Sequence, residues 1–148
     1  MNVVDSVSDI LKQKNGEVHS ISPEANVYDA IEKMAEKEIG ALPVLEGNRL
    51  VGIISERDYA RKIILKGRSS RDTLVKDVMA APPVTIGREC KVDEAMRAMT
   101  EHRVRHLPIV NADGSLRGIV SIGDLVKWII SSHEQTIEQL QVYIAGQY

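Results

Sequence analysis

The sequence predicts an α/β fold of the α+β kind, in which two pseudo-symmetric units each combine a small sheet with two packed helices. The first observation behind this prediction is helical periodicity, because apolar residues fall at positions 27, 30, 31, 34 and 35. The second is a pair of short, mainly apolar runs on either side of Gly47-Asn48, which is typical of a hairpin. The third is that this series recurs about 65 residues later, which indicates an internal repeat.

The first copy of the repeat follows an expected helix over residues 3–12 with one apolar face. A short strand is expected at Val18–Ile21. The next helix starts at Val27 and is capped by the side chain of Asn26, with Gly40 as its predicted end. Strands at Leu42–Leu45 and Leu50–Ile54 then flank the hairpin turn. We expect a second helix over residues 56–66, closed by Gly67.

The second copy aligns Val92 with Val27 and Pro108 with Pro43, each at an offset of 65. Its hairpin turn is one residue longer, so Gly118 aligns with Gly52 at an offset of 66. The repeat predicts five segments: an N-terminal arm at 1–17, a first unit at 18–67, a linker at 68–80 with a helical turn near 75–79, a second unit at 81–130, and a C-terminal helix at 131–148. That last helix carries an apolar stripe formed by Ile137, Leu140 and Ile144, which needs a partner surface.

Composition argues against several classes of protein. The formal net charge is −2 and Phe is absent, so neither a basic face nor an aromatic platform for nucleic acid is expected. No apolar run approaches the ~18 residues of a membrane span, and the first residues lack the features of a signal peptide. Cys90 is the single cysteine, which fits a reducing compartment. We therefore expect a cytoplasmic protein with no nucleic-acid or membrane partner.

Two matching stretches end a β-branched run with Ser and place an Asp three residues later. They read G-I-I-S-E-R-D at 52–58 and G-I-V-S-I-G-D at 118–124. A hydroxyl and a carboxylate at a helix start could hold a ribose diol, with a phosphate near the helix N-terminus. The same pattern is also an ordinary capping box. Both interpretations stay open on this pattern alone.

The stretches I-G-A-L-P-V-L…R-L-V-G-I-I-S-E-R-D and V-R-H-L-P-I-V…L-R-G-I-V-S-I-G-D resemble a tandem pair of CBS domains, called a Bateman module. The resemblance covers residues 18–130 and extends to small stand-alone CBS-pair proteins. It implies a non-catalytic regulatory or sensor module that binds an adenine nucleotide in clefts between the two units. AMP is the first expectation, with ADP, ATP, NAD or S-adenosylmethionine as other ligands, and no metal is required.

The resemblance also implies which residues meet the ligand. Ribose contacts are expected from Ser55, Asp58, Ser121 and Asp124; phosphate contacts from Arg57, Arg103, Arg105 and His106; and an adenine pocket from Leu42, Pro43, Leu107, Pro108 and Ile109. Basic residues near each segment support this assignment, since a phosphate favours charge-assisted hydrogen bonds. They differ between the copies, which predicts two unequal sites.

Enzymatic activity is not expected, because no nucleophile elbow and no metal-ligand set accompany Ser121, His106 and Asp124. Cys90 precedes a helix whose dipole could lower its pKa, although a lone cysteine is commonly an inert apolar residue. A homodimer is expected from the C-terminal stripe. Two other functions remain open: a regulatory subunit that mainly contacts a target protein, and a redox sensor that binds NAD(H).

Overall fold

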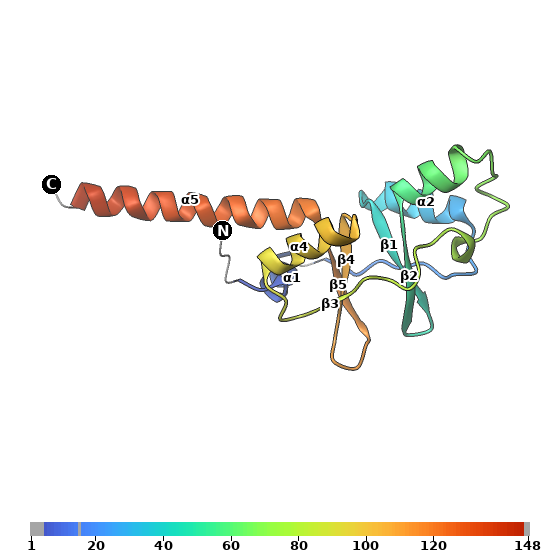
Figure 1. The fold of residues 1–148 in the computed structure, drawn as a ribbon, viewed down its shortest axis with the longest axis horizontal. Coiled ribbons are helices and arrows are strands. Elements are labelled where there is room, and N and C mark those ends of the chain that lie inside the picture. Colours follow the sequence, from blue (N-terminus) through green and yellow to red (C-terminus); the bar gives the residue numbers. More distant parts are fainter. Residues whose placement is uncertain (1–4, 15, 147–148) are drawn as a thin grey trace. The chain divides into compact units, whose positions relative to one another are not determined.

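The computed structural model describes residues 5–14 and 16–146, and the side chains of residues 5–14, 16–133 and 141 (Figure 1). Helices and small sheets alternate along the chain, which confirms the mixed α+β class. The described residues form two compact units. One contains residues 5–14, 88–107 and 120–146, and the other contains residues 16–87 and 108–119. The segmentation at 17, 67, 80 and 130 stays a prediction.

Helix α2, Val27–Lys37, begins as the sequence predicts. The Asn26 side chain accepts a hydrogen bond from the Asp29 N–H at 2.9 Å and so satisfies one donor of the first turn. The predicted end at Gly40 is wrong. Glu38 closes the helix in the left-handed region at φ 55°, and its N–H reaches back to the carbonyl of Ala35. The helix is therefore closed two residues before the predicted glycine.

Strands β1, Ala41–Glu46, and β2, Arg49–Ser55, form the predicted antiparallel hairpin around a glycine turn at φ 62° for Gly47 (Figure 1). The register pairs Ala41 with Ser55, with an irregularity after Val44. The prediction of a strand at Val18–Ile21 is wrong, because only Ile21 of this stretch pairs, in a parallel bridge to Val44.

The helix expected over 56–66 is also corrected. It starts as α3, Glu56–Asp58, and widens into a π-helix, η1, over Tyr59–Ile64, in which the Leu65 N–H bonds to the carbonyl of Ala60. Gly67 has the expected positive φ of 65° but lies beyond the helix end. The helical turn expected near 75–79 is the 3₁₀-helix η2, Val75–Asp77.

The apolar faces of these elements form one core. Its central members are fully or nearly fully buried: Val27, Ala30, Met34, Leu42, Val44, Ile54, Ile63, Val75 and Val78. The helical spacing along α2 places its three buried residues, Val27, Ala30 and Met34, on one side of the helix, where they join the side chains of the sheet. Burial of about nine such side chains stabilises this unit by removing apolar surface from water.

The second sheet has the order β3–β4–β5. Strands β4, His106–Val110, and β5, Leu116–Ser121, were predicted. The repeat also implied a strand at the start of the second unit, without bounds, and the two-residue strand β3, Ile86–Gly87, lies there. Strand β3 pairs Ile86 with Ile109 in parallel. This pairing repeats the bridge between Ile21 and Val44 at an offset of 65, so the repeat extends to backbone register.

Three helices belong to the unit that contains both described ends of the chain. Helix α1 spans Val7–Lys14, α4 spans Val92–His102, and α5 spans Ile122–Gly146. Helix α1 therefore starts later than position 3 and ends later than position 12; residues 3 and 4 lie outside the described residues. Arg103 closes α4 in the left-handed region at φ 56°, and it corresponds to Glu38, which closes α2 in the first copy.

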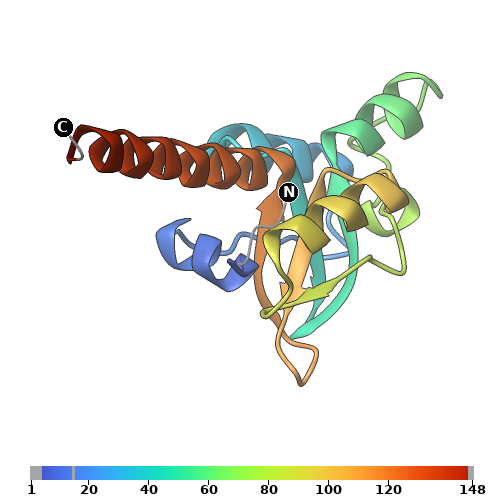
Figure 2. The ribbon, with the colours of Figure 1, turned by 60° about the vertical axis from the view of Figure 1, so that its left-hand side comes forward.

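Helix α5 runs on directly from β5 and continues without a break past residue 130 (Figure 2). The expected C-terminal helix is therefore a continuation of the last repeat helix. Its stripe of Ile137, Leu140 and Ile144 lies outside the residues whose side chains are described. Over the described part of the chain, no helix combines the length and apolar character needed to cross a bilayer.

Candidate functional site

Both Ser-x-x-Asp segments lie at a strand end that opens a helix. At β5–α5, Asp124 Oδ2 accepts the Ser121 N–H at 2.8 Å, and the Asp124 N–H donates to Ser121 Oγ at 3.1 Å. At β2–α3 the corresponding distances are 2.9 Å and 3.2 Å for Ser55 and Asp58. Each segment is therefore a reciprocal capping box, as one of the two sequence interpretations predicted.

A third Ser-x-x-Asp segment shows that this geometry alone does not mark a ligand site. At the start of α1, Asp9 Oδ2 accepts the Ser6 N–H at 3.0 Å. The serine–aspartate contact thus serves helix initiation at three places, and any ligand role must come from what surrounds the carboxylate.

Lysines distinguish the two repeat carboxylates. Lys62 Nζ lies 3.1 Å from Asp58 Oδ1 and donates to the Val78 carbonyl at 2.7 Å. Lys14 Nζ, at the end of α1, lies 2.9 Å from Asp124 Oδ2 although it is 110 residues away in sequence. Each carboxylate is therefore paired with a lysine ammonium group. The lysine beside Asp58 comes from the next helical turn, whereas the lysine beside Asp124 comes from the N-terminal arm.

The Lys14 contact sets the charge state of Asp124. Burial by itself would raise the pKa of this carboxyl, but hydrogen bonds from Lys14 and from Ser121 outweigh burial and lower the pKa below 3.8. Asp124 is thus ionised at neutral pH. As an ionised carboxylate it only accepts hydrogen bonds, which is the requirement for holding two ribose hydroxyls.

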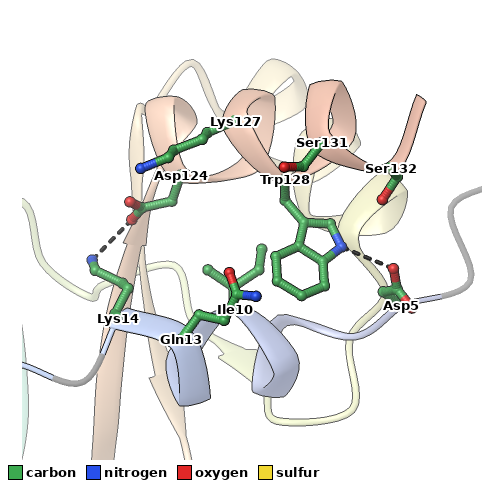
Figure 3. A pocket seen from close by; sticks show the side chains of 9 residues that line it. All are labelled: Asp5, Ile10, Gln13, Lys14, Asp124, Lys127, Trp128, Ser131 and Ser132. Atoms are coloured by element: carbon green, nitrogen blue, oxygen red, sulfur yellow. Dashed lines mark hydrogen bonds and ion pairs between the residues drawn. The ribbon is translucent and has the colours of Figure 1, made fainter. Parts of the chain in front are cut away.

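A cavity of about 410 Å³ opens beside Asp124, between α1 and the start of α5 (Figure 3). Its walls come from both helices and from Asp5: Asp5, Ile10, Gln13, Lys14, Asp124, Lys127, Trp128, Ser131 and Ser132. Figure 3 shows the Trp128 ring turned toward Ile10 and the Lys14–Asp124 pair at the opposite end of the cavity. The cavity thus offers an aromatic wall, two ammonium groups and two hydrogen-bonded carboxylates, those of Asp5 and Asp124.

The basic residues predicted to meet phosphate are placed as follows. Arg103 closes α4, and Arg105 is exposed, with its carbonyl accepting the Ile122 N–H that starts α5. His106 is half-buried, and burial lowers its pKa below 6.5 even though Asp124 acts in the opposite direction. His106 is therefore mainly neutral at neutral pH. Arg57 lies in α3 next to Asp58.

The residues predicted to line the adenine pocket are buried. Leu42, Leu107 and Ile109 are fully buried, and Pro43 and Pro108 are buried as well. Their side chains form the core, so a base could meet these strands only through backbone groups or after a local opening. Their ligand role stays a prediction.

Sequence reasoning missed Lys14, Lys62 and Trp128. Lys62 follows Asp58 at a spacing of four on a helix, and this spacing was a readable signal for an ion pair. Lys14 had no such signal, because only the tertiary fold brings α1 to Asp124. Trp128 also had none: its Nε1 donates to Asp5 Oδ2 at 2.9 Å across 123 residues of sequence.

Cys90 does not have the activated character that its place before α4 suggested. Burial raises the pKa of its thiol, and Glu94 and Asp93 raise it further. Within the described residues, no three His, Cys, Asp or Glu side chains cluster as metal ligands.

The family model of the CBS domain matches the chain twice, at residues 7–65 and 75–131. The chain belongs to the CBS-domain family. It is 40% identical over 97% of its length to the mitochondrial CBS domain-containing protein CBSX3 of Arabidopsis thaliana, and it covers 73% of that protein. The repeat identified in the sequence is therefore a CBS pair.

Solved structures of CBS-domain proteins have the same fold. A putative signal-transduction protein with CBS domains from Burkholderia ambifaria is 45% identical, with a TM-score of 0.81 over 86% of this chain and 95% of the other. A crystal structure of CBSX2 in complex with AMP is 31% identical, with a TM-score of 0.66 over 82% of this chain and 92% of the other. These likenesses confirm the CBS pair predicted from the sequence.

Proposed function

We propose that this CBS pair is a non-catalytic regulatory module that binds an adenine nucleotide, AMP in the first place, at the Ser121–Asp124 segment. The observation that carries the proposal is Asp124 itself: an ionised carboxylate at a strand-to-helix junction, beside a cavity large enough for a small organic ligand. The CBSX2 complex with AMP supports this choice of ligand. The Ser55–Asp58 segment is the second proposed site.

Regulation follows from differential binding. A nucleotide that contacts α1, β5 and α5 together would stabilise the arrangement in which these elements meet, at the expense of arrangements in which they do not. The free energy available to a regulated partner is limited to the difference in affinity between the two arrangements. No bond is made or broken in the ligand.

Self-association is part of the proposal. Val126 and Ile130 on α5 are 41% and 52% exposed, which leaves apolar surface for a second copy of the chain. We expect a homodimer. Sedimentation of the protein and of the Ile130→Glu variant checks this, since a charge in the interface should shift the protein to monomer.

Thermal unfolding with a panel of AMP, ADP, ATP, NAD, NADH and S-adenosylmethionine tests the proposal. A ligand that binds only the folded state at 100 times its Kd stabilises the protein by about 2.7 kcal/mol, which raises Tm by several degrees. Adenine nucleotides should raise Tm, and guanosine monophosphate serves as the control. No rise with any member of the panel would contradict the proposal.

A further inference from the structure

We propose that Lys14 and Lys127 read the phosphate of a nucleotide bound at Asp124, so that this site selects phosphorylated nucleotides over adenosine and over cationic adenosyl compounds. The inference rests on the proposed function and specifies the ligand class of the same site. It assigns the phosphate to the cavity between α1 and α5, instead of to the arginines that precede β4.

Helix α1 is a fixed wall of this cavity. Val7 is fully buried and Ile10 is 4% exposed, so the helix is anchored by its apolar face. The Val7 N–H donates to the Cys90 carbonyl at 2.8 Å, and the Val92 N–H donates to the Asp5 carbonyl at 2.9 Å. The bond from Trp128 to Asp5 ties α5 to the same segment. Lys14 is therefore held near Asp124 by the fold, and its charge belongs to the site with or without a ligand.

The two ammonium groups lie at the Asp124 end of the cavity. Lys14 Nζ is 2.9 Å from Asp124 Oδ2, and Lys127 follows Asp124 by three residues on α5 and lines the same cavity. Figure 3 shows both side chains extending toward that end, on opposite sides of the carboxylate. The second carboxylate of the cavity, Asp5, is hydrogen-bonded to Trp128 away from this pair. The Asp124 end therefore has two cations and one anion, which leaves an excess of positive charge there.

This charge arrangement matches a nucleoside phosphate. The ribose hydroxyls donate to Asp124, and the 5′-phosphate is carried on the same ring through one methylene group, within reach of a lysine side chain that pivots about its stem. Hydrogen bonds between ammonium groups and phosphate are charge-assisted and stronger than neutral ones. His106 adds little cationic charge because burial keeps its pKa low. A sulfonium ligand would bring a positive charge against the two lysines.

Calorimetric titration with AMP and with adenosine tests the proposal. The measured quantity is the ratio of the two dissociation constants for the wild type and for Lys14→Met, Lys127→Met and the double variant. Each single substitution should lower the preference for AMP about tenfold, the equivalent of one charge-assisted hydrogen bond, and should leave adenosine affinity nearly unchanged. Lys12→Met is the matched control, because Lys12 is an exposed lysine on the same helix and does not line the cavity.

The outcomes separate the two proposals. AMP binding that depends on Asp124, with an AMP-to-adenosine ratio unchanged in Lys14→Met and Lys127→Met, would overturn this inference and leave the proposed function standing. Lys14→Met that tightens both ligands equally would also overturn it, since Lys14 would then only compete for the carboxylate. Absence of binding by any adenine compound would overturn the proposed function and this inference with it. Lys14→Arg keeps the charge and should therefore retain most of the preference for AMP over adenosine. Loss of that preference in Lys14→Arg would contradict a role for the charge.

Discussion

At the scale of single residues, Asp124 performs two tasks with one carboxylate. Its Oδ2 atom caps the start of α5 through the Ser121 N–H and holds Lys14. Asp58 does the same for its own helix, with Lys62 as the cation. The diol of the proposed nucleotide would therefore share an acceptor that already serves the fold, and its binding would be coupled to the position of α1.

Removal of the Lys14 charge should destabilise the protein near neutral pH and make its stability depend less on pH in the acidic range. Because the folded pKa of Asp124 is lowered from 3.8, its contribution to stability is present above that value and is lost as pH falls through the folded pKa. In Lys14→Met burial remains and the ion pair is gone, so the pKa should rise. We expect a loss of about 1 kcal/mol or less near neutral pH, since both side chains are partly exposed.

Thermal unfolding of the wild type and of Lys14→Met over a pH series measures this loss. The difference in Tm should be largest above about pH 5 and should shrink toward zero as Asp124 becomes protonated in both proteins. Lys12→Met should follow the wild type throughout. A difference that stays constant with pH would show that Lys14 acts by packing and not through the carboxylate.

At the scale of elements, the helix ends are where sequence reasoning was least accurate. The start of α2 was predicted because Asn26 caps by a local side-chain bond. The end of α2 was not predicted, because Glu38 adopts the left-handed conformation that glycine usually adopts at a helix end. Likewise, the π-helix after Asp58 depends on backbone bonds from Leu65 to Ala60, for which the apolar pattern has no distinct signature.

Substitution of Glu38 by glycine should stabilise the protein. A non-glycine residue in the left-handed region carries a steric cost of roughly 1 kcal/mol, which glycine relieves at this φ of 55°. We expect Glu38→Gly to raise Tm by about 2–4 °C. Glu36→Gly, placed inside the last turn of α2, is the control and should lower Tm. A fall in Tm for Glu38→Gly would contradict the proposed strain.

Gly52 in β2 should not tolerate a side chain. A Cβ at this position would lie 2.5 Å from Met79 Sδ and 2.9 Å from the Ala80 carbonyl oxygen, and that carbonyl accepts the neighbouring Ile53 N–H. We expect Gly52→Ala to cost about 1–3 kcal/mol in the free energy of unfolding, measured by urea denaturation. Gly87→Ala is the control, since a Cβ there meets nothing within 4 Å. Equal stability of the two variants would contradict the close approach.

At the scale of the whole molecule, the duplication was the most predictable feature. The offset of 65 that aligns Pro43 with Pro108 also aligns the strand pairings of Ile21 with Val44 and of Ile86 with Ile109. The inequality of the copies was only partly predictable. The sequence showed the arginines before β4, but it could not show that Lys14 meets Asp124 across 110 residues, since that contact exists only after α1 packs.

The most direct test of the account is the calorimetric dissociation constant of AMP for the wild type and for Asp124→Asn. Asparagine keeps a side-chain oxygen that can accept the Ser121 N–H, so the cap is retained while the charge and one acceptor are lost. Asp9→Asn is the matched control, because Asp9 Oδ2 accepts the Ser6 N–H in the same way. We predict that Asp124→Asn weakens AMP binding at least about tenfold and that Asp9→Asn leaves it unchanged. Equal affinity of AMP for all three proteins would contradict the assignment of Asp124 as the ribose-binding residue.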